Sequence, residues 1–455
     1  MIKDAASDLT RGSLYNKILI FAVPLIATNL LQVLFNMADL AVVGQFSGVE
    51  TAVGSIGSTT MLVHLFTGFL IGTGGGVNAI VAKYFGANDE EGVSNTVHTA
   101  AIFSLAMGVG AYVLSLIVAL PILNLIKTKE DLIDGAILYI RIYFIGMPAL
   151  AVYNFGNGVL SSVGDTRRPL IFLTISGVCN ILLNILFVTV FDMDVAGVAI
   201  ASVISQYVSA VLIVGALIKS KDVYGLKLKK LRITLKSLGE INKIGVPAGI
   251  QAAMFQVANL FIQSGVNSFS TELVSGNSAA LNAEAFTYSI MTAFYTACST
   301  FVGQNYGAGK RKRILKTYFI CSLYSFIVAT VLGAVGMAVF GRYFLMIFTD
   351  NPAYIDAGMV RMRIMGFSYC WSVFLDCTVA ASRGLGKSIW PMFFVVMGSC
   401  VFRIIYIYTV FKAFHTPEVL YLLYLISWLL TAVAEIIYFA VIYKKLTSDF
   451  DNEED

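Results

Sequence analysis

Apolar residues gather in long stretches along the whole chain, and short polar segments separate these stretches. A helix needs about 20 mostly apolar residues to cross the hydrocarbon core of a bilayer. The stretches that reach this length lie at residues 17–43, 52–80, 96–119, 132–155, 168–191, 195–218, 240–267, 276–302, 314–339, 354–380, 389–412 and 418–443. They lack the two-residue alternation of a lipid-facing β-barrel strand. The pattern therefore predicts an all-α membrane protein with 12 transmembrane helices.

The composition also favours a membrane protein. The chain has 455 residues, of which 58% are apolar and 13% are charged, whereas soluble domains carry roughly 25% charged residues. All six cysteines fall within apolar stretches, without the spacing of a disulfide framework or a zinc site. We therefore expect no bound metal or cofactor apart from a transported cation.

Charges in the connecting segments predict the orientation in the membrane. Basic residues crowd the connections at 219–236 and 310–316, while the alternate connections are neutral or acidic. Basic loops stay in the cytoplasm. We therefore expect a multi-pass protein of the cell inner membrane with both termini in the cytoplasm, a cytoplasmic basic linker at 219–239 and a cytoplasmic acidic tail at 446–455.

The two halves of the chain repeat each other. Residues 22–24 (Ala-Val-Pro) return at 245–247 (Gly-Val-Pro), and 161–164 (Ser-Ser-Val-Gly) return at 382–386, with displacements of 221 to 223 residues. Six helices per half is an even number, so both halves enter the membrane in the same orientation and a binding site is expected at their interface. The predicted lobes are residues 1–218 and 240–445.

Three segments carry a family resemblance. They are the first-helix stretch Pro24…Gln32…Phe35-Asn36-Met37-Ala38-Asp39…Gly44, the eighth-helix exit Phe301-Val302-Gly303-Gln304-Asn305-Tyr306-Gly307-Ala308-Gly309, and the fifth-helix pair Asn180 and Asn184. With the repeat, they resemble the multidrug and toxic-compound extrusion (MATE) family over about residues 12–445. The resemblance implies two six-helix lobes around a V-shaped central cavity. It also implies export of drug-like, often cationic, compounds driven by a proton or sodium gradient.

Polar residues of the first lobe form a candidate ion-coupling site. An ionisable residue inside a membrane helix costs several kcal/mol unless it is paired or hydrated. Asp39 lies roughly 8 Å below the outer end of the first helix, and Gln32 and Asn36 share its helical face. Other polar residues lie at similar depths, roughly 9–12 Å below the outer ends of the fourth, fifth and sixth helices: Tyr139, Asn184 and Ser202, with Asn180 one turn deeper. The matching depths allow one site, which also resembles the family's first-lobe cation site.

Two chemistries suit such a site. A carboxylate with amide, phenol and hydroxyl neighbours can bind a hard cation such as Na⁺ through oxygen atoms. A buried carboxyl group can instead carry a proton, because loss of water favours its neutral form. A third reading is a buried Asp39 that amides satisfy for packing alone. Position 184 is Asn, where many proton-type relatives of this kind have a second Asp, so H⁺ and Na⁺ coupling both stay open.

The second lobe offers candidates for the wall of a substrate cavity. Gln256, Asn259 and Gln263 form a polar face on the seventh helix, and Asn259 is the repeat partner of Asn36. Sodium-type relatives often carry a Glu near Gln256. This Glu is missing here, and Asp376 is the candidate acid to replace it. Methionine adapts its shape and aromatic faces bind cations, so the cavity candidates also include Met254, Met291, Tyr288 and Tyr295, although lipid-facing packing is the commoner role.

These features favour a secondary active multidrug exporter that works by alternating access. The alternative within the superfamily is a flippase for lipid-linked oligosaccharides, which would need a more cationic cavity for a pyrophosphate. An enzyme is not expected, because the three histidines are isolated in the sequence. Arg403 and Glu435 are expected to neutralise each other. The expected partners are small-molecule substrates and membrane lipids, without nucleic acid, and the protein is expected to act as a monomer.

Overall fold

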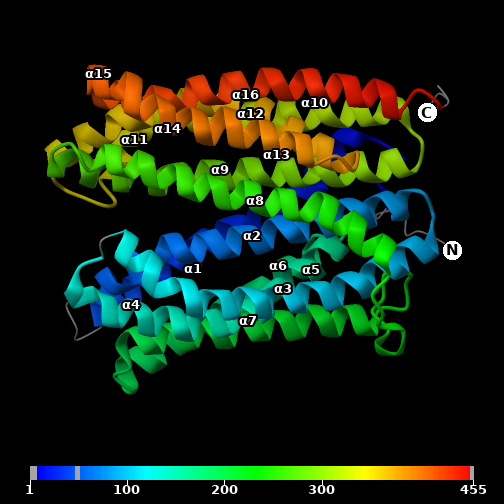
Figure 1. Ribbon diagram of the computed structural model, residues 1–455, viewed down its shortest axis with the longest axis horizontal. Coiled ribbons are helices and arrows are strands. Elements are labelled where there is room, and N and C mark those ends of the chain that lie inside the picture. The colour runs from blue at the N-terminus through cyan, green and yellow to red at the C-terminus, as the bar shows by residue number, and fades with distance from the viewer. Residues whose placement is uncertain (1–7, 47–51, 127, 451–455) are drawn as a thin grey trace. The chain divides into compact units, whose positions relative to one another are not determined.

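The computed structural model describes residues 8–46, 52–126 and 128–450, which are helical almost throughout. Within these residues the chain forms 12 helical rods and no strand, as predicted (Figure 1). The rods are α1 (Leu14–Phe46), α2 (Ala52–Gly86), α3 (Glu90–Leu125), α4 (Glu130–Tyr143) joined through the 3-10 turn η1 (Phe144–Gly146) to α5 (Met147–Ser162), α6 (Arg167–Ile185) with the π turn η2 (Leu186–Val190), α7 (Asp194–Lys219), α8 (Leu235–Val266), α9 (Thr271–Gly307), α10 (Arg311–Val328) with η4 (Ala329–Gly336) and α11 (Met337–Leu345), α12 (Pro352–Gly384), α13 (Ile389–Val395) with η5 (Val396–Val401), α14 (Phe402–Tyr406), η6 (Ile407–Phe411) and α15 (Lys412–Phe414), and α16 (Pro417–Leu446). Each predicted stretch lies within one rod or exceeds it by one residue. The last five residues of the predicted acidic tail, 451–455, lie outside the described residues.

Eleven of the rods are long and apolar enough to cross a membrane, and α9 is the exception among those described. Its sequence carries polar residues at intervals, among them Asn277, Glu284 and Gln304, and all three side chains are buried. A helix that other helices surround needs few lipid-facing apolar side chains, and polar groups can bond across its contacts. The low hydropathy of α9 therefore reflects its central position in its half of the chain.

The chain divides into two compact units. Unit 1 contains Ala27–Ala253, and unit 2 contains Asp8–Ile26 and residues 254–450. The division therefore runs through α1 and α8. The first part of α1 packs with α9, where the rings of Phe21 and Phe301 meet edge to face at 5.5 Å. The first part of α8 packs with α2. The lobe boundaries predicted from the sequence, at 218 and 240, remain a prediction.

Glycines allow α2 and α8 to pack closely within unit 1. A Cβ atom added to Gly76 would lie 2.5 Å from the Cα of Gly245, and one added to Gly72 would lie 2.6 Å from the backbone nitrogen of Gly249. Both pairs are spaced four residues apart, so each helix presents one glycine face to the other. Small residues at this spacing let the backbones of membrane helices approach each other.

Each unit gathers its basic connections at one end. In unit 1, Arg168 in the first turn of α6 donates from Nη2 to the hydroxyl of Tyr224 in the linker, 3.1 Å away. In unit 2, Arg313 at the start of α10 donates to the carbonyl of Gly12 at 3.1 Å, and Tyr443 near the end of α16 donates to the carbonyl of Arg311 at 3.2 Å. The N-terminal segment and the end of α16 therefore lie at the same end of unit 2.

Candidate functional site

A line of hydrogen bonds joins three helices of unit 1 around Asp39. Asn184 on α6 donates from Nδ2 to Asp39 Oδ1 on α1, at 2.5 Å, and the same Nδ2 lies 3.3 Å from Asn180 Oδ1. Asn180 in turn donates to the hydroxyl of Ser202 on α7 at 3.5 Å. Four of the five predicted ion-coupling residues are thus connected. Their role in coupling stays a prediction.

Close contact between α1 and α6 positions this line. A Cβ atom at Gly177 would lie 1.9 Å from Cε2 of Phe35, so the ring of Phe35 fills the space that a side chain would take. Gly177 is two turns before Asn184, and Phe35 is one turn before Asp39. The missing side chain therefore lets α1 lie against α6, which brings the carboxylate of Asp39 to the amide of Asn184.

Tyr139, the fifth predicted residue, lies beside the line without being part of it. Its ring stacks on Tyr143 at 5.4 Å and packs with Val43 and Val195. Its hydroxyl is close enough to Asp39 to interact with the charge of the carboxylate. Tyr139 therefore packs in an apolar cluster beside Asp39, whose own side chain is half-buried.

One buried hydrogen-bond acceptor near Asp39 is unsatisfied. Asn184 Oδ1 is buried and has no hydrogen-bond partner among the described residues. A 180° flip of the Asn184 amide would bring Oδ1 next to the carboxylate of Asp39, where two acceptors would repel each other. The flip therefore does not provide this oxygen with a donor. A buried acceptor without a donor costs about 1–3 kcal/mol. A cation is one group that would satisfy this oxygen.

The predicted cavity residues of α1 and α8 are partly accessible. Gln32 and Asn36 have exposed side chains and stand apart from the hydrogen-bonded line of Asp39. On the part of α8 in unit 2, Asn259 is exposed. Gln256, Gln263 and Met254 are half-buried. Gln263 is used locally, since it donates to Asn267 one turn later at 2.8 Å.

In unit 2 the remaining cavity candidates separate into core and surface. Met291 is fully buried in the hydrophobic core, so its side chain does not line an open cavity. Tyr295 is also buried, while Tyr288 is 39% exposed and its ring lies 6.4 Å from that of Tyr295. Asp376 is half-buried and lies within electrostatic reach of Tyr288.

The expected pairing of Arg403 with Glu435 does not form. Arg403 is 1% exposed, donates from Nε to the hydroxyl of Ser427 at 3.0 Å, and lies over the ring of Tyr424 at 4.4 Å. Both carboxylate oxygens of Glu435 are buried without a hydrogen-bond partner among the described residues. The aromatic face of Tyr424 takes the place of the carboxylate because cation–π attraction also suits a guanidinium in an apolar interior.

A buried ion pair that sequence reasoning missed lies between α9 and α12. Arg361 donates from Nε and Nη2 to the two oxygens of Glu284, at 2.6 and 2.8 Å, and from Nη1 to Asn277 Oδ1 at 3.0 Å. The side chains of Arg361 and Glu284 are only 3% and 4% exposed. The signal was present in the sequence, since two opposite charges inside membrane helices need partners. Their separation of 77 residues gave no indication that they meet.

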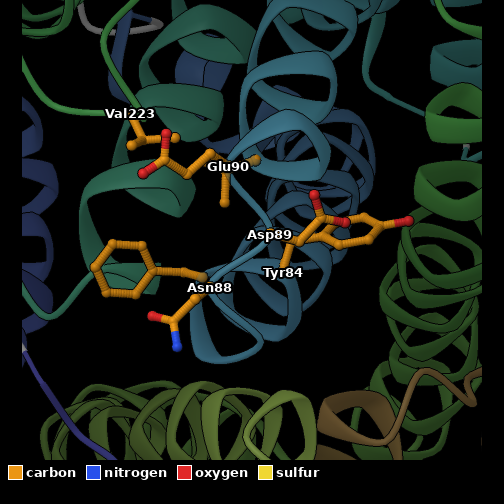
Figure 2. A pocket seen from close by; sticks show the side chains of 7 residues that line it. Tyr84, Asn88, Asp89, Glu90 and Val223 are labelled. Carbon is orange, nitrogen blue, oxygen red and sulfur yellow. The ribbon is translucent and has the colours of Figure 1, made fainter. Parts of the chain in front are cut away.

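A surface pocket of about 280 Å³ lies at the far end of α2 from Asp39 (Figure 2). Ala52 at the start of α2 packs in the same cluster as Tyr139, and Tyr84, which lines the pocket, comes roughly 48 Å later along the helix. Asp89 and Glu90 also line it, from the turn into α3. The pocket is therefore separate from the candidate ion site.

Comparison with known protein families decides the classification. The MatE family model matches residues 24–186 and again residues 247–409. The chain belongs to the MatE family. The two matches begin 223 residues apart, which agrees with the repeat read from the sequence. MatE proteins are transporters, so the expectation that the chain is not an enzyme is confirmed.

Curated relatives of this MatE protein are transport and resistance proteins. It is 29% identical to the probable multidrug resistance protein YpnP of Bacillus subtilis, covering 80% of this chain and 81% of the relative. It is 21% identical to the multidrug export protein MepA of Staphylococcus saprophyticus, over 85% and 88% of the two chains. It is 23% identical to a FAD transporter of Shewanella oneidensis, over 71% and 72%.

Solved structures share the fold. A MOP superfamily transporter from Pyrococcus furiosus superposes with a TM-score of 0.90 at 20% identity, covering 98% of this chain and 99% of the other. An outward-facing multidrug resistance MATE transporter gives the same TM-score and identity, with coverage of 98% and 100%. The chain is therefore a multi-pass membrane transporter with the MATE fold.

Proposed function

We propose that the chain is a secondary active multidrug exporter in which a cation bound at Asp39 is exchanged for a drug-like, often cationic, compound. The names of several relatives support the substrate class. The observation that carries the coupling proposal is the hydrogen-bonded line from Asp39 through Asn184 and Asn180 to Ser202, with its one unpaired buried acceptor. Binding of the cation changes the balance between conformations by no more than its difference in affinity for them.

We propose Na⁺ as the coupling cation. Na⁺ binds through several oxygen atoms, and the line supplies oxygens of Asp39, Asn180, Asn184 and Ser202. A proton on the carboxyl group would let Asp39 donate to the oxygen of a reoriented Asn184, whereas Na⁺ would bind that oxygen directly. The single carboxylate supports the same choice, because Asn184 offers an oxygen ligand without adding a second site for a proton.

The orientation is also a proposal. The basic linker between α7 and α8 and the basic residues at 310–316 support a cytoplasmic location for their ends of the units, by the positive-inside rule. Asp39 then lies toward the outer side of the membrane, and both termini are cytoplasmic. We expect the protein to act as a monomer, because the proposed ion site is built entirely within one chain.

Ethidium efflux from proteoliposomes tests the proposal. We expect the wild-type protein to extrude ethidium under an imposed Na⁺ gradient and the Asp39→Asn variant to lose this efflux while remaining folded. Asp134→Asn is the matched control, because Asp134 is an exposed aspartate on α4 of the same unit and its removal changes the net charge equally. Retained efflux in Asp39→Asn would refute the role of Asp39, and efflux under a proton gradient alone would identify H⁺ as the coupling ion.

The flippase alternative receives less support. Of the buried arginines in unit 2, Arg361 is already neutralised by Glu284, Arg403 lies on Tyr424, and Arg313 is bonded to the carbonyl of Gly12. Absence of ethidium efflux under either gradient, together with transfer of a lipid-linked sugar across the bilayer, would establish the flippase instead.

A further inference from the structure

The segment between α7 and α8 presents a surface that is both basic and apolar. Within residues 227–236, which we call the linker face, basic and large apolar side chains alternate, and all of them are exposed: Lys227, Lys229, Lys230, Arg232 and Lys236, with Leu228, Leu231, Ile233 and Leu235. Leu228 is 61% exposed and Leu235 is 82% exposed. The sequence has no acidic residue between Asp222 and Glu240. Water would be a poor environment for so many neighbouring apolar side chains.

Hydrogen bonds hold the backbone of the linker face against α3. The backbone N–H of Lys227 donates to His98 Nε2 at 3.0 Å, and that of Thr234 donates to the hydroxyl of Thr99 at 3.0 Å. Arg232 donates from Nη2 to Asn95 Oδ1 at 2.9 Å. The other ring nitrogen of His98 lies 2.6 Å from the carbonyl of Ser94. A carbonyl can only accept, so His98 carries its proton on Nδ1 and is fully used in holding the linker.

The contacts place the linker face beside α3 rather than beyond its end. Asn95 and Thr99 follow Glu90, the first residue of α3, by about 8–14 Å along the helix axis. The 35-residue span of α3 is about 52 Å long, whereas the hydrocarbon core is about 30 Å thick. Roughly 11 Å therefore projects at each end. For a helix centred on the bilayer, this length places the linker face at the depth where headgroups meet the hydrocarbon.

The same helix is turned toward lipid. Only 17% of the apolar window of α3 is buried inside the protein, the lowest share among the candidate spans that the structure describes. Residues 96–100 of α3, beneath the linker face, are buried, and exposed apolar side chains begin at Leu105. The linker face therefore lies at the border of the lipid-facing part of α3. Basic side chains attract anionic lipid headgroups there, and apolar neighbours insert into the boundary with the acyl chains.

We propose that the linker face binds anionic phospholipid headgroups of the membrane leaflet on its own side, with Leu228, Leu231 and Leu235 inserted beneath them. The nearby pocket at the turn from α2 to α3 is unsuited to an anion, because Asp89 and Glu90 line it. The proposal concerns a lipid-binding surface and is independent of the exported substrate. Only the identity of the leaflet, the cytoplasmic one, rests on the proposed orientation.

Fluorescence quenching by brominated lipid tests the proposal on the full chain in nanodiscs. A bimane label on Leu231→Cys reports contact. Five of the native cysteines are buried and Cys179 is half-buried, and the labelled parent protein measures their background. We expect brominated phosphatidylglycerol to quench the label more strongly than the same fraction of brominated phosphatidylcholine. Each lysine near an anionic surface contributes about fivefold to the preference.

Two charge-matched variants make the result specific. Lys229→Gln with Lys230→Gln should lower the preference for phosphatidylglycerol about fivefold for each lysine removed. Lys444→Gln with Lys445→Gln, an exposed lysine pair at the end of α16, should leave it unchanged. Equal quenching by both lipids would overturn the proposal, as would an equal loss in both variants. Absence of quenching by either lipid would also overturn it and leave the linker face to a soluble acidic partner.

Discussion

Removal of Arg361 from its pair with Glu284 should destabilise unit 2 severely. Arg361→Met would leave the carboxylate of Glu284 buried without its two guanidinium donors. Asn277 Oδ1 would also lose the hydrogen bond that it accepts from Arg361 Nη1. Only the hydroxyl of Tyr369, 3.3 Å from Glu284 Oε2, would remain beside the carboxylate. Breaking a buried ion pair on one side costs about 3–5 kcal/mol.

A double variant separates this cost from ordinary loss of packing. Glu284→Leu combined with Arg361→Met removes both charges and replaces them with apolar side chains. Such replacements are often neutral or stabilising. The double variant should therefore recover most of the stability that Arg361→Met alone loses. Arg342→Met provides the control in the same unit, because the pair of Arg342 with Asp356 is exposed and should contribute no more than about 1 kcal/mol.

Thermal unfolding in detergent, followed by tryptophan fluorescence, measures the effect. The ring of Trp428 lies 5.6 Å from that of Tyr369, so it reports on this region. At about 2–4 °C per kcal/mol for a unit of this size, Arg361→Met should lower Tm by about 6–20 °C. A shift no larger than that of Arg342→Met would refute the reasoning. The reasoning would also be refuted if the double variant lost as much stability as Glu284→Leu and Arg361→Met lose when added together.

Two further predictions concern the packing of each unit. Gly76→Ala should destabilise unit 1 by about 1–3 kcal/mol, because the new Cβ would lie 2.5 Å from the backbone of Gly245. The control Gly75→Ala meets nothing within 4 Å and should stabilise α2 by up to about 1 kcal/mol. Equal melting temperatures for the two variants would contradict the close approach of α2 and α8. Glu435→Gln should leave the melting temperature unchanged or raise it, because the carboxylate of Glu435 is buried without a hydrogen-bond partner among the described residues; a fall of several degrees would reveal a contact that stabilises the charge.

The membrane-spanning helices could be predicted from the sequence because the signal is local. Each stretch must supply its own apolar length to cross the hydrocarbon core, and each predicted stretch coincides with one helical rod. The stretch at 276–302, within α9, was predicted from its apolar residues as well, although the hydropathy of α9 is below that of the other spans described. The even number of helices per half likewise determines which connecting segments lie at the same end of their helices.

Depth along a helix was also available from the sequence. A fixed rise per residue put Asp39, Asn184 and Ser202 at similar depths, and the structure places them in one hydrogen-bonded line with Asn180. The sequence did not determine the rotation of each helix about its own axis, that is, which of its faces is buried. Met291 turns into the core, and Gln32 and Asn36 stay exposed beside Asp39, because neighbouring helices decide which face of each helix is covered.

Only the tertiary structure decided which distant groups pair. Every ionisable residue inside the membrane needs compensation, and the sequence suggested Arg403 and Glu435 as one such pair. It contained no distance between them. Packing of α9 against α12 joins Glu284 to Arg361. The aromatic surface of α16 receives Arg403, and Glu435 lies within electrostatic reach of Arg383 instead. Charge and hydropathy are properties of single residues, whereas a partner is a property of the packed helices, and that is the physical limit of the sequence.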